Sequence, residues 1–298
     1  MSQEAENIAT VCMPTAVGGP GRADSEKHKP KRPYTIELHS RAVERVISAI
    51  RGRLDESISL REMAAIAYMS RYHFIRTFRQ VTGVPPRRFL SALRVEAATR
   101  MLLNSNHSVT DICLDVGYSS LGTFIRRFSA VLGISPMRLR MLRRSTTKDL
   151  LGPMANGKSD NAIYAQPVVM GRVLAPSSFS GPIFIGLFSS AIPEGVPVAC
   201  SINLQSGSYL VSSVPPGRYY VLALGLPWPD DMNDYFRYET ALRGGELVTV
   251  GDGLAECPDI NLRVAVPTDP PILLNLPSLL RKYQGLSKPA GDLAAKTS

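Results

Sequence analysis

The sequence predicts a multi-domain protein of class α plus β, in which an all-α unit of two helix-turn-helix copies precedes an all-β antiparallel sandwich. Three observations predict this class. Apolar residues recur at spacings of three and four in the first half, whereas the second half has short runs of Val, Ile, Tyr and Phe between Pro and Gly. One segment of the first half occurs twice. Arginine is concentrated in that same half, and 298 residues are enough for two separate cores.

The chain is expected to begin with a flexible arm over residues 1–39, which lack apolar periodicity and contain a basic stretch interrupted by proline. A first helix then runs from Arg41 to about Leu54, because the apolar residues between Val43 and Ile50 fall on one of its faces. The first thirty residues are polar and no run of eighteen apolar residues occurs. We therefore expect neither a secretion signal nor a membrane span.

An internal repeat is the strongest pattern in the chain. The segment SLREMAAIAYMSRYHFIRTFRQVTGVPP is similar to the later segment SVTDICLDVGYSSLGTFIRRFSAVLGISP. Identical residues recur at an offset of 50 residues, and among them Phe74, Arg76, Phe78, Gly83 and Pro86 match Phe124, Arg126, Phe128, Gly133 and Pro136. Upstream of them the offset is 49, so the second turn contains one more residue. Each copy is expected to form a short helix, a tight turn and a longer helix.

Serine and glycine mark the predicted ends of the longer helix in each copy. Ser70 is a candidate N-cap for a helix that ends near Gly83. In the second copy, either Ser119 or Ser120 is the candidate N-cap of a helix that ends near Gly133. These residue types favour helix ends because a serine hydroxyl accepts a free backbone N–H and glycine adopts a left-handed conformation without strain.

After residue 150 the pattern becomes that of strands separated by turn residues. The candidate strands are Val168–Leu174, Ile183–Phe188, Tyr209–Val214, Tyr219–Leu224, Glu246–Val250 and Ile260–Val264. The expected division of the chain is a flexible arm at 1–39, the double helix-turn-helix domain at 40–145, a linker at 146–160, the β-sandwich at 161–270 and a C-terminal segment at 271–298. In this last segment we expect a short helix near 278–283 and a disordered tail.

Positive charge belongs to the helical part. Residues 1–150 carry 24 Lys and Arg against 13 Asp and Glu, a net charge of +11, whereas the remaining residues carry 10 against 12. Between Arg41 and Arg144 all 18 basic residues are arginine. This concentration favours a polyanionic partner, with a merely solvated basic surface as the alternative.

The longer helix of each copy has an inner and an outward face on a helical wheel. Aromatic residues fall on the inner faces, where we expect them only to pack in the core: Phe74, Phe78, Phe124 and Phe128. The outward faces carry arginine at one equivalent position of both copies. A helix fits the major groove of DNA, in which arginine can donate two hydrogen bonds to guanine and isoleucine can contact a thymine methyl group.

The outward side chains of both longer helices are the candidates for DNA contact. Arg76 and Arg126 are expected to contact bases, with a solvated or phosphate-bound arginine as the alternative. Arg71, Arg79 and Arg127 are expected to hold phosphates, as are the serines at the helix starts, where backbone amides are free. The complete predicted set is Ser70, Arg71, Tyr72, Ile75, Arg76 and Arg79 in the first copy and Ser120, Leu121, Thr123, Ile125, Arg126 and Arg127 in the second.

A single stiff helix is expected to join the two copies, because residues 87–103 contain no Gly or Pro and carry apolar residues at helical spacing. Two copies joined in this way would present their longer helices to successive major grooves, roughly 34 Å apart on one face of the DNA. One chain could then bind an asymmetric site, and bending of the DNA would help to seat both helices.

Residues 41–144 resemble the AraC/XylS-type DNA-binding domain. The resemblance lies in AAIAYMSRYHFIRTFRQVTGVPPRRF, in LRVEAATRMLLNSNHSVTDICLDVGYSSLGTFIRRF and in the closing GISPMRLR. It covers about a third of the chain and implies seven helices, recognition helices that begin at Ser70 and Ser120, and regulation of bacterial promoters. It also implies promoter DNA and RNA polymerase as partners, with Arg126 as the clearest base-reading arginine.

The chain departs from this family pattern at three points. Tyr68 occupies a turn position where the family often has glycine. Leu121 and Gly122 stand where polar residues are frequent in the second recognition helix, so the sequence read by this copy is not implied by the resemblance. The family usually places its effector domain before the DNA-binding domain, whereas here the added domain follows it. A sugar-binding cupin is therefore not implied.

The β part is similar to carboxypeptidase-regulatory-like and transthyretin-like sandwiches over SGSYLVSSVPPGRYYVLALGLP. In the hairpin that this resemblance implies, Tyr219 and Val221 alternate with Tyr220 and Leu222 across the sheet. A purely structural sandwich is one alternative for this part. Binding of a small-molecule effector, homodimer formation and contact with another partner are the others.

Several classes of site are not expected. All four histidines precede the β part and the four cysteines contain no CxxC pair, so we expect no metal, no disulfide framework and a reducing cytoplasm. The acidic residues Asp230, Asp231 and Asp234 favour a solvated loop over a calcium site. No GxSxG or P-loop occurs, and we expect no cofactor and no enzymatic activity. The alternatives are an enzyme with an attached DNA reader, comparable to DNA-repair alkyl transferases, and an architectural DNA-binding protein.

Overall fold

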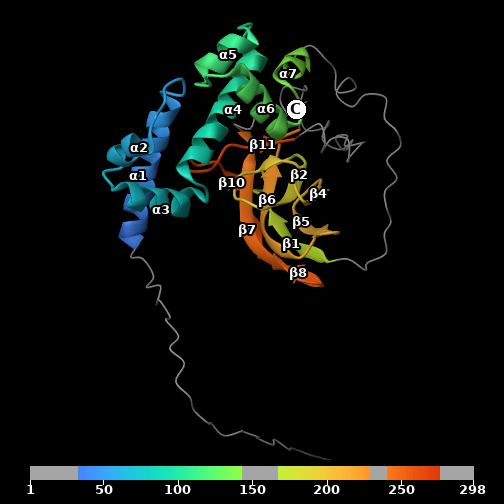
Figure 1. The fold of residues 1–298 in the computed structure, drawn as a ribbon. Helices are drawn as coiled ribbons and strands as arrows, with labels where there is room; N and C mark the ends of the chain where they lie inside the picture. The colour runs from blue at the N-terminus through green and yellow to red at the C-terminus, as the bar shows by residue number, and fades with distance from the viewer. Residues whose placement is uncertain (1–32, 143–166, 229–239, 276–298) are drawn as a thin grey trace, which may run out of the picture.

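The computed structural model describes residues 33–142, 167–228 and 240–275 (Figure 1). The helices come first: α1 Pro33–Arg51, α2 Leu60–Ile66, α3 Arg71–Thr82, α4 Pro86–Asn104, α5 Val109–Asp115, α6 Leu121–Leu132 and α7 Pro136–Leu142. The strands follow: β1 Val168–Leu174, β2 Ile183–Phe188, β3 Glu194–Gly195, β4 Ala199–Asn203, β5 Gly207–Val211, β6 Gly217–Gly225, β7 Leu242–Val250, β8 Leu254–Glu256, β9 Ile260–Asn261, β10 Arg263–Val264 and β11 Leu273–Leu274. The chain thus has a helical part and a β-rich part.

The ends of the two longer helices, α3 and α6, lie where serine and glycine predicted them. The hydroxyl of Ser70 accepts the backbone N–H of the third residue of α3, and Ser120, rather than Ser119, does the same for α6. Both helices end at a glycine in the left-handed conformation, Gly83 with φ 78° and Gly133 with φ 67°. The predicted repeat of helix, turn and helix is confirmed.

The first helix differs from its predicted bounds. It begins at Pro33, eight residues before Arg41, and ends at Arg51. Proline is favourable in the first turn of a helix, and an ion pair between Glu37 and Arg41 at 2.6 Å links the next two turns. These turns are exposed, so no apolar stripe marks them in the sequence. The flexible arm expected over 1–39 is therefore helical from residue 33, and residues 1–32 lie outside the described residues.

Aromatic rings form an equivalent core in both copies. Phe78 contacts Phe74 and Phe89 at centroid distances of 5.5 and 5.4 Å. In the second copy Phe124 contacts Tyr118 and Phe128 at 5.4 and 5.6 Å. The phenylalanines are fully buried, and the rings meet edge-on in the first copy and tilted in the second. Aromatic pairs add about 0.5–1.5 kcal/mol each beyond the burial of their surface. The predicted core role of the four repeat phenylalanines is confirmed.

The strands form two main sheets and one short pair. One sheet has the order β5-β1-β8, with β9 also paired to β1, and the other has the order β10-β7-β6-β2-β4. The five-stranded sheet is antiparallel throughout, but β1 runs parallel to β8 and β9. The expectation of a wholly antiparallel β part is therefore wrong at this edge. The reason is that β8 and β9 reach β1 by a crossover from the other sheet, and a crossover can deliver a parallel strand where a hairpin cannot.

The predicted strands are found, although not always with the predicted ends. β1 and β2 have the expected bounds, β6 and β7 extend further, and the strand expected over 260–264 is divided into β9 and β10. The short strands β3, β8 and β11 and the five-residue β4 were not expected. Segments of two or three residues carry no detectable alternation, and β4 has the weakly apolar sequence ACSIN.

The two main sheets share one core. Val169, Val173 and Val211 of the four-stranded sheet are buried with Ile185 and Val221 of the five-stranded sheet. Along β6 the side chains alternate between this core and the opposite face of the sheet. Tyr219 and Val221 point to the shared core, whereas Tyr220 and Leu222 line the opposite face, as the sequence predicted. The β part is thus a two-sheet region with a largely antiparallel pattern.

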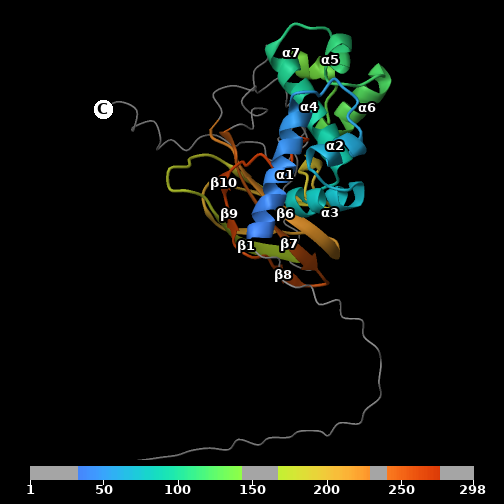
Figure 2. The ribbon, with the colours of Figure 1, turned by 90° about the vertical axis from the view of Figure 1, so that its left-hand side faces the viewer.

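The opposite face of the five-stranded sheet lies against the helical part, as Figures 1 and 2 show. Phe184, Phe188 and Leu224 of this sheet belong to the same buried cluster as the helical core. The short pair β3 and β11 contacts α6, and β11 also contacts α4. Figure 2 places α1 and α3 on the viewer's side of the sheets. The helical and β parts are therefore packed together rather than merely joined by a linker.

Several expectations concern residues outside the described ranges. They are the linker at 146–160, the helix near 278–283, the disordered tail and the acidic loop that contains Asp230, Asp231 and Asp234. Among the helices that the structure describes, none is long and apolar enough to cross a membrane.

Candidate nucleic-acid interface

The tight turn of each helix-turn-helix copy contains one residue in the left-handed conformation. In the second copy this residue is Gly117, with φ 82°. In the first copy the equivalent position holds Tyr68, with φ 56°. The turn therefore requires a positive φ in both copies, which glycine adopts freely and tyrosine adopts with strain. The Tyr68 side chain is 86% exposed, and the Arg45 guanidinium lies 5.5 Å from its ring centre, an arrangement that partly offsets the strain.

The outward face of α3 brings together most of the residues predicted for the first copy. Tyr72, Ile75, Arg76 and Arg79 line one shallow hollow on this helix. The two arginines and Tyr72 are exposed, and Ile75 is half-buried because it also packs against the core. Arg71 precedes them, and its guanidinium lies 5.5 Å from the Tyr72 ring centre. This helix therefore presents a positively charged surface that also carries one aromatic and one aliphatic side chain.

The outward face of α6 is exposed as well, but it is less polar. Leu121, Thr123, Ile125 and Arg126 are all exposed. The Thr123 hydroxyl lies 3.3 Å from the Ser120 hydroxyl, which fixes the first turn of the helix. Arg126 occupies the position that Arg76 occupies on α3. The two longer helices thus expose the same arginine beside different neighbours.

Among the predicted site residues, Arg127 differs because its guanidinium is bound by other residues of the protein instead of pointing to the outward face of α6. Its Nη2 donates to a carboxylate oxygen of Glu194 at 2.7 Å, and its Nε donates to the Ser91 hydroxyl at 3.3 Å. The second oxygen of the same carboxylate accepts from Arg88 Nε at 3.1 Å and pairs with its Nη2. In the first copy the equivalent of Arg127 is Thr77, which is buried. The position of Arg127 therefore faces the body of the protein.

The short helices that support α3 and α6 begin with the same ionised cap. Glu62 accepts the backbone N–H of Ser59 at 2.7 Å, and Asp111 accepts the Ser108 hydroxyl at 2.7 Å and the Ser108 backbone N–H at 3.2 Å. The backbone hydrogen bond is the main cause that lowers the pKa of Glu62, whereas the serine hydroxyl is the main cause that lowers the pKa of Asp111. Both carboxylates therefore stay ionised at neutral pH and complete the capping boxes.

The sequence did not indicate the contact between Glu194 and the two arginines. Glu194 lies 106 positions from Arg88 and 67 from Arg127, in a strand of two residues. No local pattern signals a pairing over such separations. The only available signal was the internal repeat itself, which aligns Arg127 with a threonine rather than with a second arginine. Within the described ranges, no group of three or more His, Cys, Asp or Glu side chains could hold a metal ion.

Comparison with known proteins matches the helical part. A family model described as a helix-turn-helix domain matches residues 63–141. The HTH-type transcriptional activator AarP of Providencia stuartii is 30% identical over 105 residues, which are 35% of this chain and 78% of AarP. The bifunctional transcriptional activator/DNA repair enzyme AdaA of Bacillus subtilis is 30% identical over 102 residues, which are 34% of this chain and 48% of AdaA.

For three other curated relatives, the match spans 30–42% of their length. Among solved structures, the DNA-binding domain of AdpA in complex with a target DNA is 34% identical to this chain. The alignment covers 34% of this chain and 90% of the AdpA chain, with a TM-score of 0.33. The match to AarP extends over most of that protein. Together with the paired helix-turn-helix geometry, it shows that the chain is a DNA-binding transcription regulator and belongs to the AraC-type family of helix-turn-helix regulators.

Proposed function

We propose that the chain binds promoter DNA sequence-specifically by placing α3 and α6 in successive major grooves. The observation that carries this proposal is the exposure of Arg76 and Arg126 at one equivalent position of two helices that begin and end alike. The helix α4 joins the copies without a break, and its 19 residues span about 28 Å. This length is comparable to the roughly 34 Å between successive major grooves.

The exposed side chains of α3 and α6 divide into two proposed roles. Arg76 and Arg126 contact base edges, and Ile75, Leu121 and Ile125 contact thymine methyl groups. Near the helix starts, the residues that hold phosphates or contact base edges are Ser70, Arg71, Tyr72, Ser120 and Thr123. Arg79, in the last turn of α3, holds a phosphate. We assign no DNA contact to Arg127, because its guanidinium is engaged by Glu194 within the chain.

The β part is proposed to be a transthyretin-like sandwich that modulates this DNA reader. Two contacts support the proposal, one at the end of each recognition helix. A side chain at Gly83, which ends α3, would meet Ala191, and a side chain at Gly133, which ends α6, would meet Asn275. The β part therefore lies against the ends of both recognition helices. Promoter DNA and RNA polymerase are the proposed partners, and the bacterial cytoplasm is the proposed place of action.

Selection of genomic fragments by the purified full-length protein tests the reading of DNA. The salt concentration must be held fixed, because phosphate contacts make affinity strongly salt-dependent. We expect one asymmetric motif with two half-sites about one helical turn apart. Recovery of a symmetric motif would indicate a homodimer instead. Equal recovery of all fragments would contradict sequence-specific binding and favour an architectural role.

A further inference from the structure

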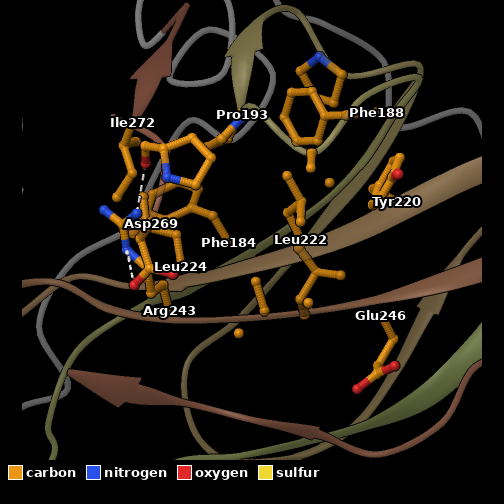
Figure 3. Close-up of a pocket in the computed structure, with 18 of the residues that line it drawn as sticks. Phe184, Phe188, Pro193, Tyr220, Leu222, Leu224, Arg243, Glu246, Asp269 and Ile272 are labelled. Carbon is orange, nitrogen blue, oxygen red and sulfur yellow. Dashed lines mark hydrogen bonds and ion pairs between the residues drawn. The ribbon is translucent and has the colours of Figure 1, made fainter. Parts of the chain in front are cut away.

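A cavity of about 560 Å³ lies between the end of α3 and the outer face of the five-stranded sheet (Figure 3). Phe184, Phe188, Leu222 and Leu224 project from β2 and β6 toward it. Residues 81–83 of the first helix-turn-helix copy form part of the opposite wall. A volume between 300 and 1,000 Å³, roughly, with mostly apolar walls is typical of pockets that bind small molecules.

The sequence of the sheet explains why this face is hollow. In the register of the sheet, Cys200 lies beside Gly186, Gly186 beside Leu222, and Leu222 beside Gly245. One row across four strands therefore has glycine at two of its positions. The ring of Phe188 lies over Gly186, and the Leu222 side chain leans over Gly245. This row therefore projects less side-chain volume from the sheet than four larger residues would. The helical part packs over the row but leaves a cavity above it.

One end of the cavity contains a largely buried arginine with incomplete partners. Only 16% of the Arg243 side chain is exposed, and its Nη1 donates to the Pro270 carbonyl at 2.7 Å. Its Nε is buried without a hydrogen-bond partner in the part of the chain that the structure describes. The nearest carboxylate oxygen, on Asp269, lies 4.0 Å from this nitrogen. Loss of hydration on burial lowers the pKa of Arg243, and the charge of Asp269 partly opposes this shift.

The neighbouring carboxylates are already held by other arginines. Arg263 donates two hydrogen bonds of 2.8 Å to Asp269, and Arg51 pairs with Glu96 at 3.1 Å. The group of charges around Arg243 therefore has three arginines for two carboxylates. Arg243 thus shares Asp269 with Arg263, which holds that carboxylate more closely. A largely buried cation that shares its counter-ion is incompletely compensated, and an anion bound at this end of the cavity would lower that cost.

We propose that this cavity binds a small apolar monocarboxylate, with its carboxylate at Arg243 and its apolar body over Leu222 and Phe184. The proposal deepens, and rests on, the proposed modulatory role of the β part. A second anionic group is not accommodated, because Glu246 lines the far, open end of the cavity away from Arg243 (Figure 3). Aliphatic and aromatic monocarboxylates both have this combination of one carboxylate and an apolar group, and the experiment below distinguishes between them.

Displacement of a fluorescent aromatic monoanion, anilinonaphthalene sulfonate, from the full-length protein tests the site. Octanoate and phenylpropanoate are the competitors, and their uncharged amides are the matched controls. We expect one of the carboxylates to displace the probe at concentrations about ten- to a hundredfold below those of its amide, since a hydrogen bond to a charged group is worth about 1.5–3 kcal/mol. The better competitor shows whether the pocket favours an aliphatic or an aromatic body.

Two variants locate the binding, and a third controls for charge. Arg243→Gln should remove the preference for carboxylate over amide, and Leu222→Trp should weaken carboxylate and amide alike because it fills the cavity. Arg172→Gln removes an exposed arginine of β1 that does not line the cavity and should change neither. Absence of saturable displacement, or displacement that both cavity variants leave unchanged, would overturn the proposal.

DNA affinity of the same proteins, measured separately at fixed salt, keeps the two proposals apart. Normal DNA binding by a protein that shows no carboxylate binding would remove the cavity proposal and leave the DNA reader intact. Carboxylate binding by a protein that shows no sequence-specific DNA binding would have the opposite meaning. With both activities present, we expect a bound carboxylate to change DNA affinity about fivefold or more, because residues 81–83 end a recognition helix.

Discussion

The two helix-turn-helix copies have the same capped helices and aromatic core, but they differ at the tight turn and in what surrounds the recognition helix. In the first copy Tyr68 occupies the left-handed position with its side chain in solvent, whereas in the second copy Gly117 lies directly beneath Arg94. The helix α6 contacts β3 and β11, and α3 ends at the apolar cavity. The same local sequence pattern thus occurs in two surroundings. The recognition helix of the second copy packs against two strands, and that of the first copy ends beside a cavity.

The largest expected effect comes from the turn of the second copy. Gly117→Ala combines a positive φ with a Cβ that would meet the Leu54 carbonyl and the Arg94 guanidinium, so we expect a loss of about 2 to 4 kcal/mol in the free energy of unfolding. Chemical denaturation followed by the helical circular dichroism signal measures it. Tyr68→Ala is the matched control. It keeps the strained φ but meets open solvent, so its effect should stay below about 1 kcal/mol.

An equal decrease in the free energy of unfolding for these two variants would mean that the turn of the second copy is no more tightly packed than that of the first. A larger loss for Tyr68→Ala would mean that the contact of its ring with Arg45 stabilises the turn more than the geometry suggests.

The second largest effect concerns DNA reading by the equivalent arginines. Arg126→Ala and Arg76→Ala should each cost about 1 to 3 kcal/mol of specific binding and relax the preference at one base position. The two positions should lie in different half-sites. Arg79→Ala is the control, because a phosphate contact should weaken all sequences alike and reduce the salt dependence of binding. Binding selections at fixed salt measure all three. Uniform loss on every sequence for Arg126→Ala would remove its base-reading role.

A third prediction tests the bracing of the second copy. Glu194→Gln leaves Arg88 and Arg127 without their shared counter-ion, and it should lower the free energy of unfolding by about 1 to 2 kcal/mol. The expected loss is small because water partly screens the charges of Arg88 and Arg127, whose side chains are 40% and 30% exposed. Glu246→Gln, at an exposed acid of β7, is the control and should change stability little. No loss for Glu194→Gln relative to this control would mean that the ion pairs of Glu194 do not stabilise α6.

The sequence contained enough information for the helical part because its signals are local. Ser70 and Gly83 mark the ends of a helix by their own hydrogen bonding and backbone preference, and the repeat shows that Phe78 and Phe128 share one environment. The early start of α1 was missed because its first turns are exposed and lack an apolar stripe.

Non-local structure was out of reach of the same reasoning. The parallel pairing of β1 with β8 and β9 depends on a crossover between sheets, and the charge group around Arg243 gathers residues from both parts of the chain. Neither leaves a periodic signal in the sequence. The predicted site residues show the same difference between local and non-local signals. The exposure of Arg126 follows from its position on α6, whereas the position of Arg127 depends on the distant acid Glu194.

The smallest expected effect separates the two capping boxes. The pKa of Glu62 is lowered mainly by a backbone N–H, which Ser59→Ala leaves in place, whereas the pKa of Asp111 is lowered mainly by the hydroxyl that Ser108→Ala removes. Carboxyl titration by NMR should therefore show a larger upward shift of the Asp111 pKa in Ser108→Ala than of the Glu62 pKa in Ser59→Ala.

The dependence of stability on pH follows from the same two carboxylates. Because the pKa of each carboxylate is lower in the folded protein than in the unfolded chain, each stabilises the fold above the unfolded-chain pKa and loses this contribution as the pH falls through the folded value. The wild-type protein should thus lose more stability on acidification than Glu62→Gln or Asp111→Asn. Ser108→Ala should flatten the acid limb of the stability curve more than Ser59→Ala does. The reverse order would mean that the hydroxyl, and not the backbone, dominates the cap of the first copy.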